Sequence, residues 1–136
     1  MSVRIDSIYQ GDLRVAGTHG PSKVGIITDA PVDNHGKGES FSPTDLVATA
    51  LTHCMATIMG IKAKSLGLPL EGMTLSVEKI MSADAPRRIV KLPVTITVPV
   101  ATTDEQKRSL IAAAELCPVS KSLNPEIEKP IVWNWA

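Results

Sequence analysis

The sequence of 136 residues has few aromatic side chains and no excess of charge of either sign. It contains two Trp, one Tyr and one Phe, and its 14 Lys and Arg residues balance 14 Asp and Glu residues. Proteins that bind nucleic acid usually carry a clustered basic surface, and neither sign of charge clusters here. We therefore expect no nucleic-acid partner.

The sequence also lacks a signal peptide and a membrane-spanning segment. Residues 1–12, MSVRIDSIYQGD, have no apolar central region of the kind that a signal peptide needs. The longest apolar run, Leu46 to Ile61, is interrupted by polar residues that include Thr49, Thr52 and His53, and it is shorter than the roughly 20 residues that span a bilayer. We expect a soluble, cytoplasmic protein with no membrane partner.

Cysteine is scarce as well. Cys54 and Cys117 lie far apart, and neither belongs to a C-x-x-C pair of the kind found in zinc or thioredoxin-type sites. The three histidines, His19, His35 and His53, show no metal-ligand spacing. We therefore expect no metal site, no cofactor and no disulfide scaffold.

The hydrophobic pattern predicts an α+β protein. Three short runs with alternating apolar residues, among them Val3, Ile5 and Tyr9, precede residue 30 and indicate half-buried strands. A long helix, two strands within residues 72–100, a second helix that Pro118 stops, and a last strand follow. This order predicts one domain over residues 1–136, in which an antiparallel sheet packs against two main helices.

The long helix has clear start and stop residues. Ser42 is a suitable N-cap, Pro43 suits the first helical position, Asp45 completes an S-x-x-D capping pattern, and Gly67 is a plausible stop. Its apolar residues nearly encircle it, so the helix must be buried on nearly every side. Because one short chain can scarcely do this alone, we expect an intertwined homodimer with this helix at its centre.

Both cysteines fall on the apolar stripes of their helices, where a free cysteine is commonly a small buried hydrophobic residue. The segment FSPTDLVATALTHC (41–54), followed by LCPVSKSLNPEI (116–127), nevertheless resembles the paired signature of the OsmC/Ohr superfamily. That superfamily comprises the osmotically inducible protein C and the organic hydroperoxide resistance protein. The order of helices and strands agrees along essentially the whole chain, so the resemblance implies an OsmC-like fold and a homodimer with active sites at its interface.

The resemblance implies a thiol-dependent peroxidase that acts in oxidative stress defence. Cys54 is then the peroxidatic cysteine, which becomes a sulfenic acid on attacking an organic hydroperoxide or hydrogen peroxide. Cys117 is the resolving cysteine, and a dithiol reductant of the lipoyl or thioredoxin type reopens the disulfide. Cys117 is expected at a helix C-terminus, where the dipole disfavours a thiolate.

A buried thiol needs nearby positive charge to ionise. In the family an arginine lies in the N-terminal strands or in the loop before the helix. Arg14 has the opposite parity to its apolar neighbours and is expected to face solvent. Arg88 shares parity with Val90 and Leu92, so it is preferred over Arg87 and Arg14 as the arginine that serves the first cysteine.

The matching carboxylate is less clearly placed. Thr44 stands where peroxidases of the family have glutamate, and Asp45 follows it. Asp45 falls nearly opposite Cys54 around the helix, so it is either the site's carboxylate or only a charge matched to the helix dipole. Glu39, in the preceding loop, is a further candidate.

Two alternatives stay open. The protein is a non-catalytic or redox-sensing OsmC-like protein if the arginine and carboxylate are incomplete. It is an acyl-type small-molecule binder or a thioesterase-like enzyme, without peroxidase turnover, if an apolar crevice holds the ligand.

Overall fold

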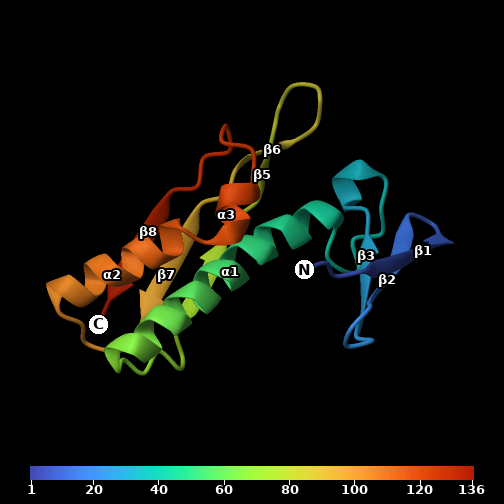
Figure 1. The fold of residues 1–136 in the computed structure, drawn as a ribbon. Coiled ribbons are helices and arrows are strands. Elements are labelled where there is room, and N and C mark those ends of the chain that lie inside the picture. The colour runs from blue at the N-terminus through green and yellow to red at the C-terminus, as the bar shows by residue number, and fades with distance from the viewer. The chain divides into compact units, whose positions relative to one another are not determined.

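The structure is a computed structural model that describes all 136 residues (Figure 1). Contacts between residues divide the chain into two compact units, Met1–Leu46 and Val47–Ala136. The α+β class is confirmed, because small sheets and two main helices alternate along the chain. The single domain over residues 1–136 stays a prediction.

The N-terminal unit contains a three-stranded antiparallel sheet in the order β1-β2-β3. Its elements are β1 (Ile5–Gly11), β2 (Arg14–His19), β3 (Gly25–Asp29) and the 3-10 turn η1 (Val32–Asn34). The turn between β1 and β2 places Gly11, Asp12 and Leu13 at positive φ (89°, 53° and 63°), which suits the glycine. The three strands expected before residue 30 are therefore present.

The N-terminal unit has almost no core of its own. Asp29 and Ser42 are its buried residues, while Val3, Ile5 and Tyr9, expected to be half-buried, are exposed. The alternating pattern correctly predicted strands but not their burial, because a sheet face is buried only where a second layer covers it.

The helix α1 (Pro43–Leu66) has the bounds that the sequence predicts. The Ser42 hydroxyl oxygen accepts the Asp45 N–H at 3.0 Å, and Asp45 Oδ2 accepts the Ser42 N–H at 2.9 Å. This reciprocal pair satisfies two amide groups that the helix start leaves without partners. Gly67 ends the helix at φ +68°, a conformation that glycine adopts without steric cost.

The second unit contains the hydrophobic core. Besides its part of α1, its elements are β4 (Thr74–Val77), β5 (Ile80–Met81), β6 (Ile89–Lys91), β7 (Val94–Val98), α2 (Asp104–Glu115), α3 (Pro118–Ser122) and β8 (Ile131–Trp135). In Figure 1, α1 and α2 lie across one face of the sheet that contains β7 and β8. The buried side chains of α1, β7 and α2 form one cluster: Ala48, Leu51, Met55, Met59, Ala63, Val94, Ile96, Val98, Leu110 and Ala114.

The sheet of the second unit differs from the expected antiparallel one. Its order is β4-β7-β8, and β8 runs parallel to β7 while β4 runs antiparallel to it. A parallel neighbour requires a crossover, and the segment that contains α2 and α3 supplies one between β7 and β8. Residues 72–100 also form four short strands instead of two, and Pro93, which has no N–H with which to continue the ladder, separates β6 from β7.

By length and composition alone, α1 could cross a membrane. The core helix of a soluble protein passes the same test, and one face of α1 packs in the core of the second unit. The expected lack of a membrane partner stays a prediction.

Candidate functional site

The structure brings the two cysteines together within the second unit. Cys54 lies in the middle of α1 and is half-buried, whereas Cys117 lies between α2 and α3 and is fully buried. The Cys54 thiol lies close enough to Cys117 to raise the pKa of the Cys117 thiol, and both thiols are free. The helices that cover one sheet thus place the two thiols close together.

Cys117 lies at the start of a helix as well as after the end of one. It is the N-cap of α3, with φ −62° and ψ 138°, and its Sγ accepts the Ser120 N–H at 3.3 Å. We expected the dipole of the preceding helix to dominate at Cys117. This expectation is wrong, because Cys117 also lies at the N-terminus of α3. Pro118 stops α2, but its fixed φ also suits the first position of a new helix.

Burial raises the pKa of the Cys117 thiol, and the neighbouring Cys54 adds to this rise. The Ser120 amide acts in the opposite direction, because a hydrogen bond to sulfur stabilises the thiolate. Burial is the larger influence, so Cys117 is a protonated thiol at neutral pH. A protonated thiol is a poor nucleophile toward peroxide.

Arg88 does not face inward as its parity suggests. It precedes β6, and its guanidinium, with a side-chain exposure of 44%, forms an ion pair with Asp84 at 3.3 Å and donates to the Pro86 carbonyl at 2.9 Å. This guanidinium lowers the pKa of Asp84. Because β6 begins only at Ile89, the alternation of the strand does not extend to Arg88.

Asp45 has a clear role at the start of α1, where its carboxylate accepts the Ser42 amide. The hydroxyl groups of Thr44 and Ser42 are also within hydrogen-bond distance, at 3.2 Å. These contacts account for Asp45 as a capping residue. Its role toward an arginine stays a prediction.

The sequence analysis missed an ion-pair cluster in the N-terminal unit. Arg14 donates from Nε to Oδ1 of Asp29 at 2.6 Å and from Nη2 to Oδ2 at 2.8 Å, and Glu39 lies 3.6 Å from the same guanidinium. The Asp29 side chain is only 2% exposed, and it also accepts the Glu39 N–H at 3.1 Å. The hydrogen bond from Arg14 lowers the pKa of Asp29.

The prediction that Arg14 faces solvent is therefore wrong. Leu13 belongs to the turn, at φ +63°, so it gives no information about strand parity. Arg14 and Asp29 are cross-strand partners in β2 and β3. Pairing the second strand with the third places Asp29 directly opposite Arg14. These opposite charges were the signal in the sequence that could have identified the pair.

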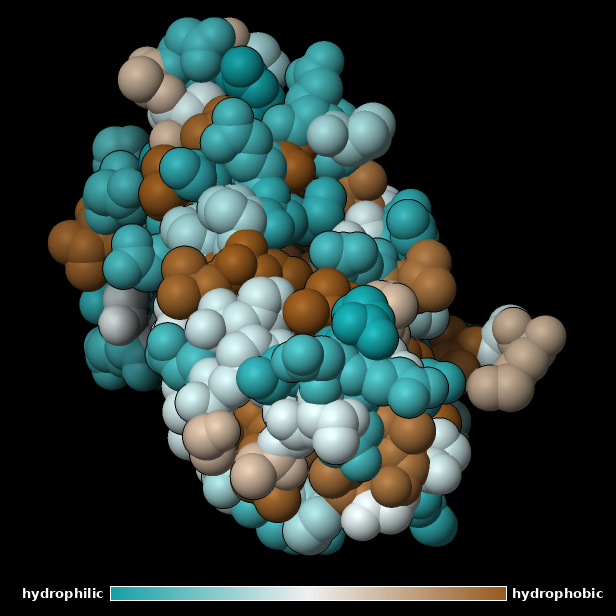
Figure 2. Space-filling model, turned by 90° about the vertical axis from the view of Figure 1, so that its left-hand side faces the viewer, coloured by the Kyte–Doolittle hydropathy of each residue, from teal (hydrophilic) through white to brown (hydrophobic).

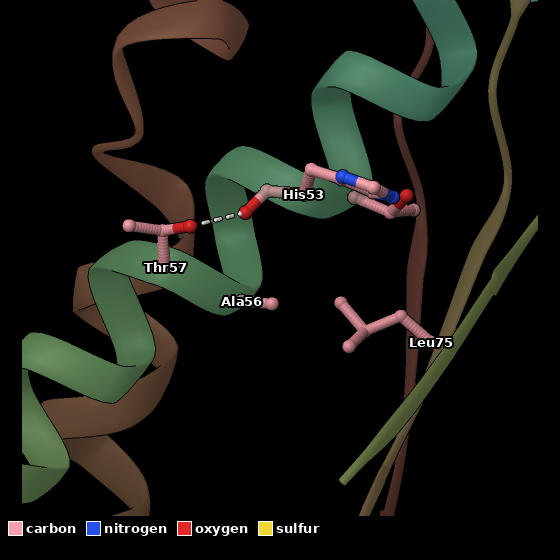
Figure 3. A pocket seen from close by; sticks show the side chains of 5 residues that line it. His53, Ala56, Thr57 and Leu75 are labelled. Atoms are coloured by element: carbon pink, nitrogen blue, oxygen red, sulfur yellow. Dashed lines mark hydrogen bonds between the residues drawn. The ribbon is translucent and has the colours of Figure 1, made fainter. Parts of the chain in front are cut away.

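Besides a larger hollow of about 580 Å³ that includes Gly60, Ala63 and Leu70 in its lining, two smaller hollows lie beside α1 in the second unit. The first, of about 380 Å³, is lined by Thr52, His53, Ala56, Thr57 and Leu75. Figure 3 shows the His53 ring and the Leu75 side chain at the space between α1 and β4. The Thr57 hydroxyl donates to the His53 carbonyl at 2.8 Å, so its proton is already used within the helix.

The second hollow, of about 320 Å³, lies between α1 and α2 and is mostly apolar. Its lining includes Ile58, one turn after Cys54, and Leu116, which directly precedes Cys117. Ile61 and Leu116 are 65% and 63% exposed, which is unusual for large apolar side chains. An apolar surface thus adjoins the two thiols along the chain. The structure gathers no group of three His, Cys, Asp or Glu side chains that could hold a metal ion.

The fold of the chain is similar to that of several proteins of known structure. No curated protein sequence matches the chain. The structure is similar to those of two organic hydroperoxide resistance proteins: that of Legionella pneumophila (15% identity, TM-score 0.75, 98% of this chain and 97% of the other) and that of Elizabethkingia anophelis (14%, 0.80, 100% and 97%). At these identities, the likeness shows the fold alone.

A structure from Psychrobacter arcticus is much more similar in sequence. That protein is named for osmotic stress induction and a detoxification response, and it is 45% identical, with a TM-score of 0.91 over 96% of this chain and 94% of the other. The family model described as OsmC-like protein matches residues 36–129, which include both cysteines. The chain therefore belongs to the OsmC-like protein family.

Proposed function

We propose that this protein reduces hydroperoxides through a cycle of its two cysteines. The observation that carries the proposal is that Cys54 of α1 and Cys117, the N-cap of α3, lie close enough for their thiols to interact while both are free. The names of the Legionella and Elizabethkingia proteins, which refer to organic hydroperoxide resistance, support it at the level of the fold.

The different surroundings of the two thiols support their assigned roles. The Cys54 sulfur, which is half-buried, attacks the hydroperoxide ROOH, and ROH leaves as Cys54 becomes a sulfenic acid. The Cys117 sulfur then displaces the hydroxyl group of the sulfenic acid as water, and a disulfide forms. A neighbouring thiol is needed because a sulfenic acid otherwise oxidises further and irreversibly.

The proposal requires a positive charge that favours the Cys54 thiolate, and Arg88 with Asp45 remains the first assignment. The contacts of Arg88 to the Asp84 carboxylate are long, at 3.3 and 3.4 Å, so this carboxylate holds it only weakly, although Nη1 also donates to the Pro86 carbonyl at 2.9 Å. Arg14 is the alternative, because Asp29 and Glu39 hold it in the way that an active-site arginine needs to be held.

The substrate that we propose is an organic hydroperoxide. The apolar hollow between α1 and α2, with Ile58 and Leu116 in its lining, supports an organic rather than an inorganic peroxide. A dithiol reductant of the lipoyl or thioredoxin type completes the cycle. We propose the cytoplasm as the protein's compartment, because the cycle needs a supply of such a reductant.

We also propose that the working unit is a homodimer. The N-terminal sheet exposes apolar side chains that its own unit does not cover, including Ile5, Ile8 and Ile27. Exposed apolar surface of this extent marks an interaction site. Figure 2 shows hydrophobic side chains in several patches on the face that it presents.

A steady-state peroxidase assay tests the proposal. The wild type should turn over cumene hydroperoxide with a lipoyl or thioredoxin reductant, and more efficiently than hydrogen peroxide. Cys54→Ser should lose this turnover while keeping its far-UV circular dichroism spectrum. Peroxidase turnover that survives in Cys54→Ser would contradict the proposal, and a different, thiol-independent activity that survives in this variant would favour the acyl-type binder or thioesterase-like enzyme.

A redox-sensing protein is the second candidate. Arg14 and Arg88 both pair with carboxylates in the structure, which reduces the positive charge that either can offer a thiolate. A sensor would form the disulfide once with peroxide and show negligible steady-state turnover. Mass analysis of the oxidised chain beside the turnover assay distinguishes the two.

A further inference from the structure

The helix α3 is unusually dependent on one sulfur atom. It has only five residues, too few to be stable without other contacts. Its first turn is closed by two bonds to Cys117: the Ser120 N–H donates to Sγ at 3.3 Å, and the Lys121 N–H donates to the carbonyl oxygen at 3.1 Å. Val119 and Leu123 pack against the core and hold the rest of the segment.

The sulfur that caps α3 is also the one that lies beside Cys54. In the reduced protein, Cys117 Sγ accepts the Ser120 amide and is itself fully inaccessible to solvent. A dithiol reductant can attack either sulfur of a disulfide, and attack at Cys117 requires that this buried sulfur first becomes exposed. A change in α3 that follows oxidation would open this route.

We propose that disulfide formation removes the cap of α3, and that the loosened segment Pro118–Ser122 uncovers Cys117 for the reductant. This inference rests on the proposed function for its place in the cycle. When the disulfide forms, Cys117 Sγ gives up its proton and bonds to Cys54 Sγ, and the hydroxyl group of the Cys54 sulfenic acid leaves as water. The S–S bond draws this sulfur to about 2 Å from Cys54 Sγ and away from its position as the acceptor of the Ser120 N–H. The Ser120 amide then has no partner at the N-terminus of the helix.

Hydrogen exchange measured by mass spectrometry tests this inference. Reduced protein and protein oxidised with diamide are compared, so that the disulfide forms without any peroxidase activity. The oxidised protein should exchange the amides of residues 119–122 about fivefold faster or more, as expected for the loss of one N-cap. Amides of α2 should exchange equally in both states.

Two substitutions separate the cap from the disulfide. Cys117→Ser keeps an N-cap side chain, so α3 should be protected with or without diamide. Cys117→Ala has no acceptor, so α3 should exchange about fivefold faster even in the absence of oxidant. Protection of α2 serves as the control for folding in both variants.

Equal exchange of α3 in the reduced and disulfide states would overturn the inference. It would also be overturned if Cys117→Ala protected α3 as well as Cys117→Ser, or if diamide gave no intramolecular disulfide. A disulfide that forms with diamide but not with cumene hydroperoxide would instead contradict the proposed function, and the exchange of α3 would still decide the role of the cap.

Discussion

At the scale of single residues, the two thiols have the same chemistry but different surroundings. Burial raises the pKa of Cys117, whereas Cys54 is half-buried on a helix face. The sulfur that accepts an amide hydrogen bond is thus the protonated one. The roles of the two cysteines can therefore be tested by their reactivity alone.

The first prediction concerns alkylation. At pH 7, iodoacetamide should modify Cys54 well before Cys117, because the raised pKa of Cys117 leaves little thiolate and its sulfur is fully buried. The rate at Cys117 should rise only as the pH climbs above the ordinary range of a cysteine. Peptide mass spectrometry at several pH values measures both rates, and equal rates at the two sites would contradict the assignment.

The second prediction concerns resolution. Cys117→Ser should allow one fast oxidation of Cys54 and then accumulate sulfinic and sulfonic acid, because no thiol captures the sulfenic acid. Stopped-flow kinetics and intact mass after peroxide treatment measure this, with Cys54→Ser as the unreactive control. If Cys54→Ser is oxidised rapidly and Cys117→Ser is not, the two roles are reversed.

The third prediction concerns the arginine. Arg88→Ala should slow the first oxidation of Cys54, while Arg4→Ala, which removes an exposed ion pair with Asp6, should not. If Arg14→Ala slows the oxidation and Arg88→Ala does not, the positive charge comes from the N-terminal sheet. Each variant is measured under the conditions used for the wild type.

At the scale of elements, the residues that start and stop helices predicted the structure better than the alternation of apolar and polar residues along strands. Ser42, Pro43 and Gly67 correctly predicted both ends of α1, because caps act through local contacts. Parity failed at Leu13, which lies in a turn, and Pro118 starts α3 as well as stopping α2. The parallel pairing of β8 could not be predicted either, since it depends on where a long crossover returns. The apolar stripes of the two helices already indicated that the two cysteines could meet over one sheet, and the family resemblance added their roles.

The fourth prediction tests the start of α1. Ser42→Ala should lower the free energy of unfolding by about 1 kcal/mol or more, because it removes the acceptor of the Asp45 amide. Thr103→Ala, which removes the corresponding cap of α2, should cost a similar amount. Urea unfolding of both variants measures the loss. A Ser42→Ala protein as stable as the wild type would show that the cap contributes little.

At the scale of the whole molecule, the two units differ in how many of their side chains they bury. The second unit has a continuous core, whereas the first buries only Asp29 and Ser42. A sheet that exposes both apolar and charged side chains requires another surface to be stable. This imbalance supports the proposed homodimer.

The fifth prediction concerns that assembly. Light scattering should show a dimer at micromolar concentration, and Ile8→Asp should shift it toward monomer, because Ile8 is an exposed apolar residue of β1. Asp6→Asn lies on the same strand and removes only an exposed ion pair, so it should leave the dimer intact. A stable monomer of the wild type would contradict the proposal.

The lack of a core in residues 1–46 also bears on how the protein is made. Synthesis begins at the N-terminus, so this segment leaves the ribosome before the residues that form the core have been added. Because this segment buries almost no side chains, it gains little free energy by folding at that stage. Its apolar strands therefore remain accessible to chaperones and proteases. Residues 47–136, which are translated later, can therefore form their core before the N-terminal strands are stably folded.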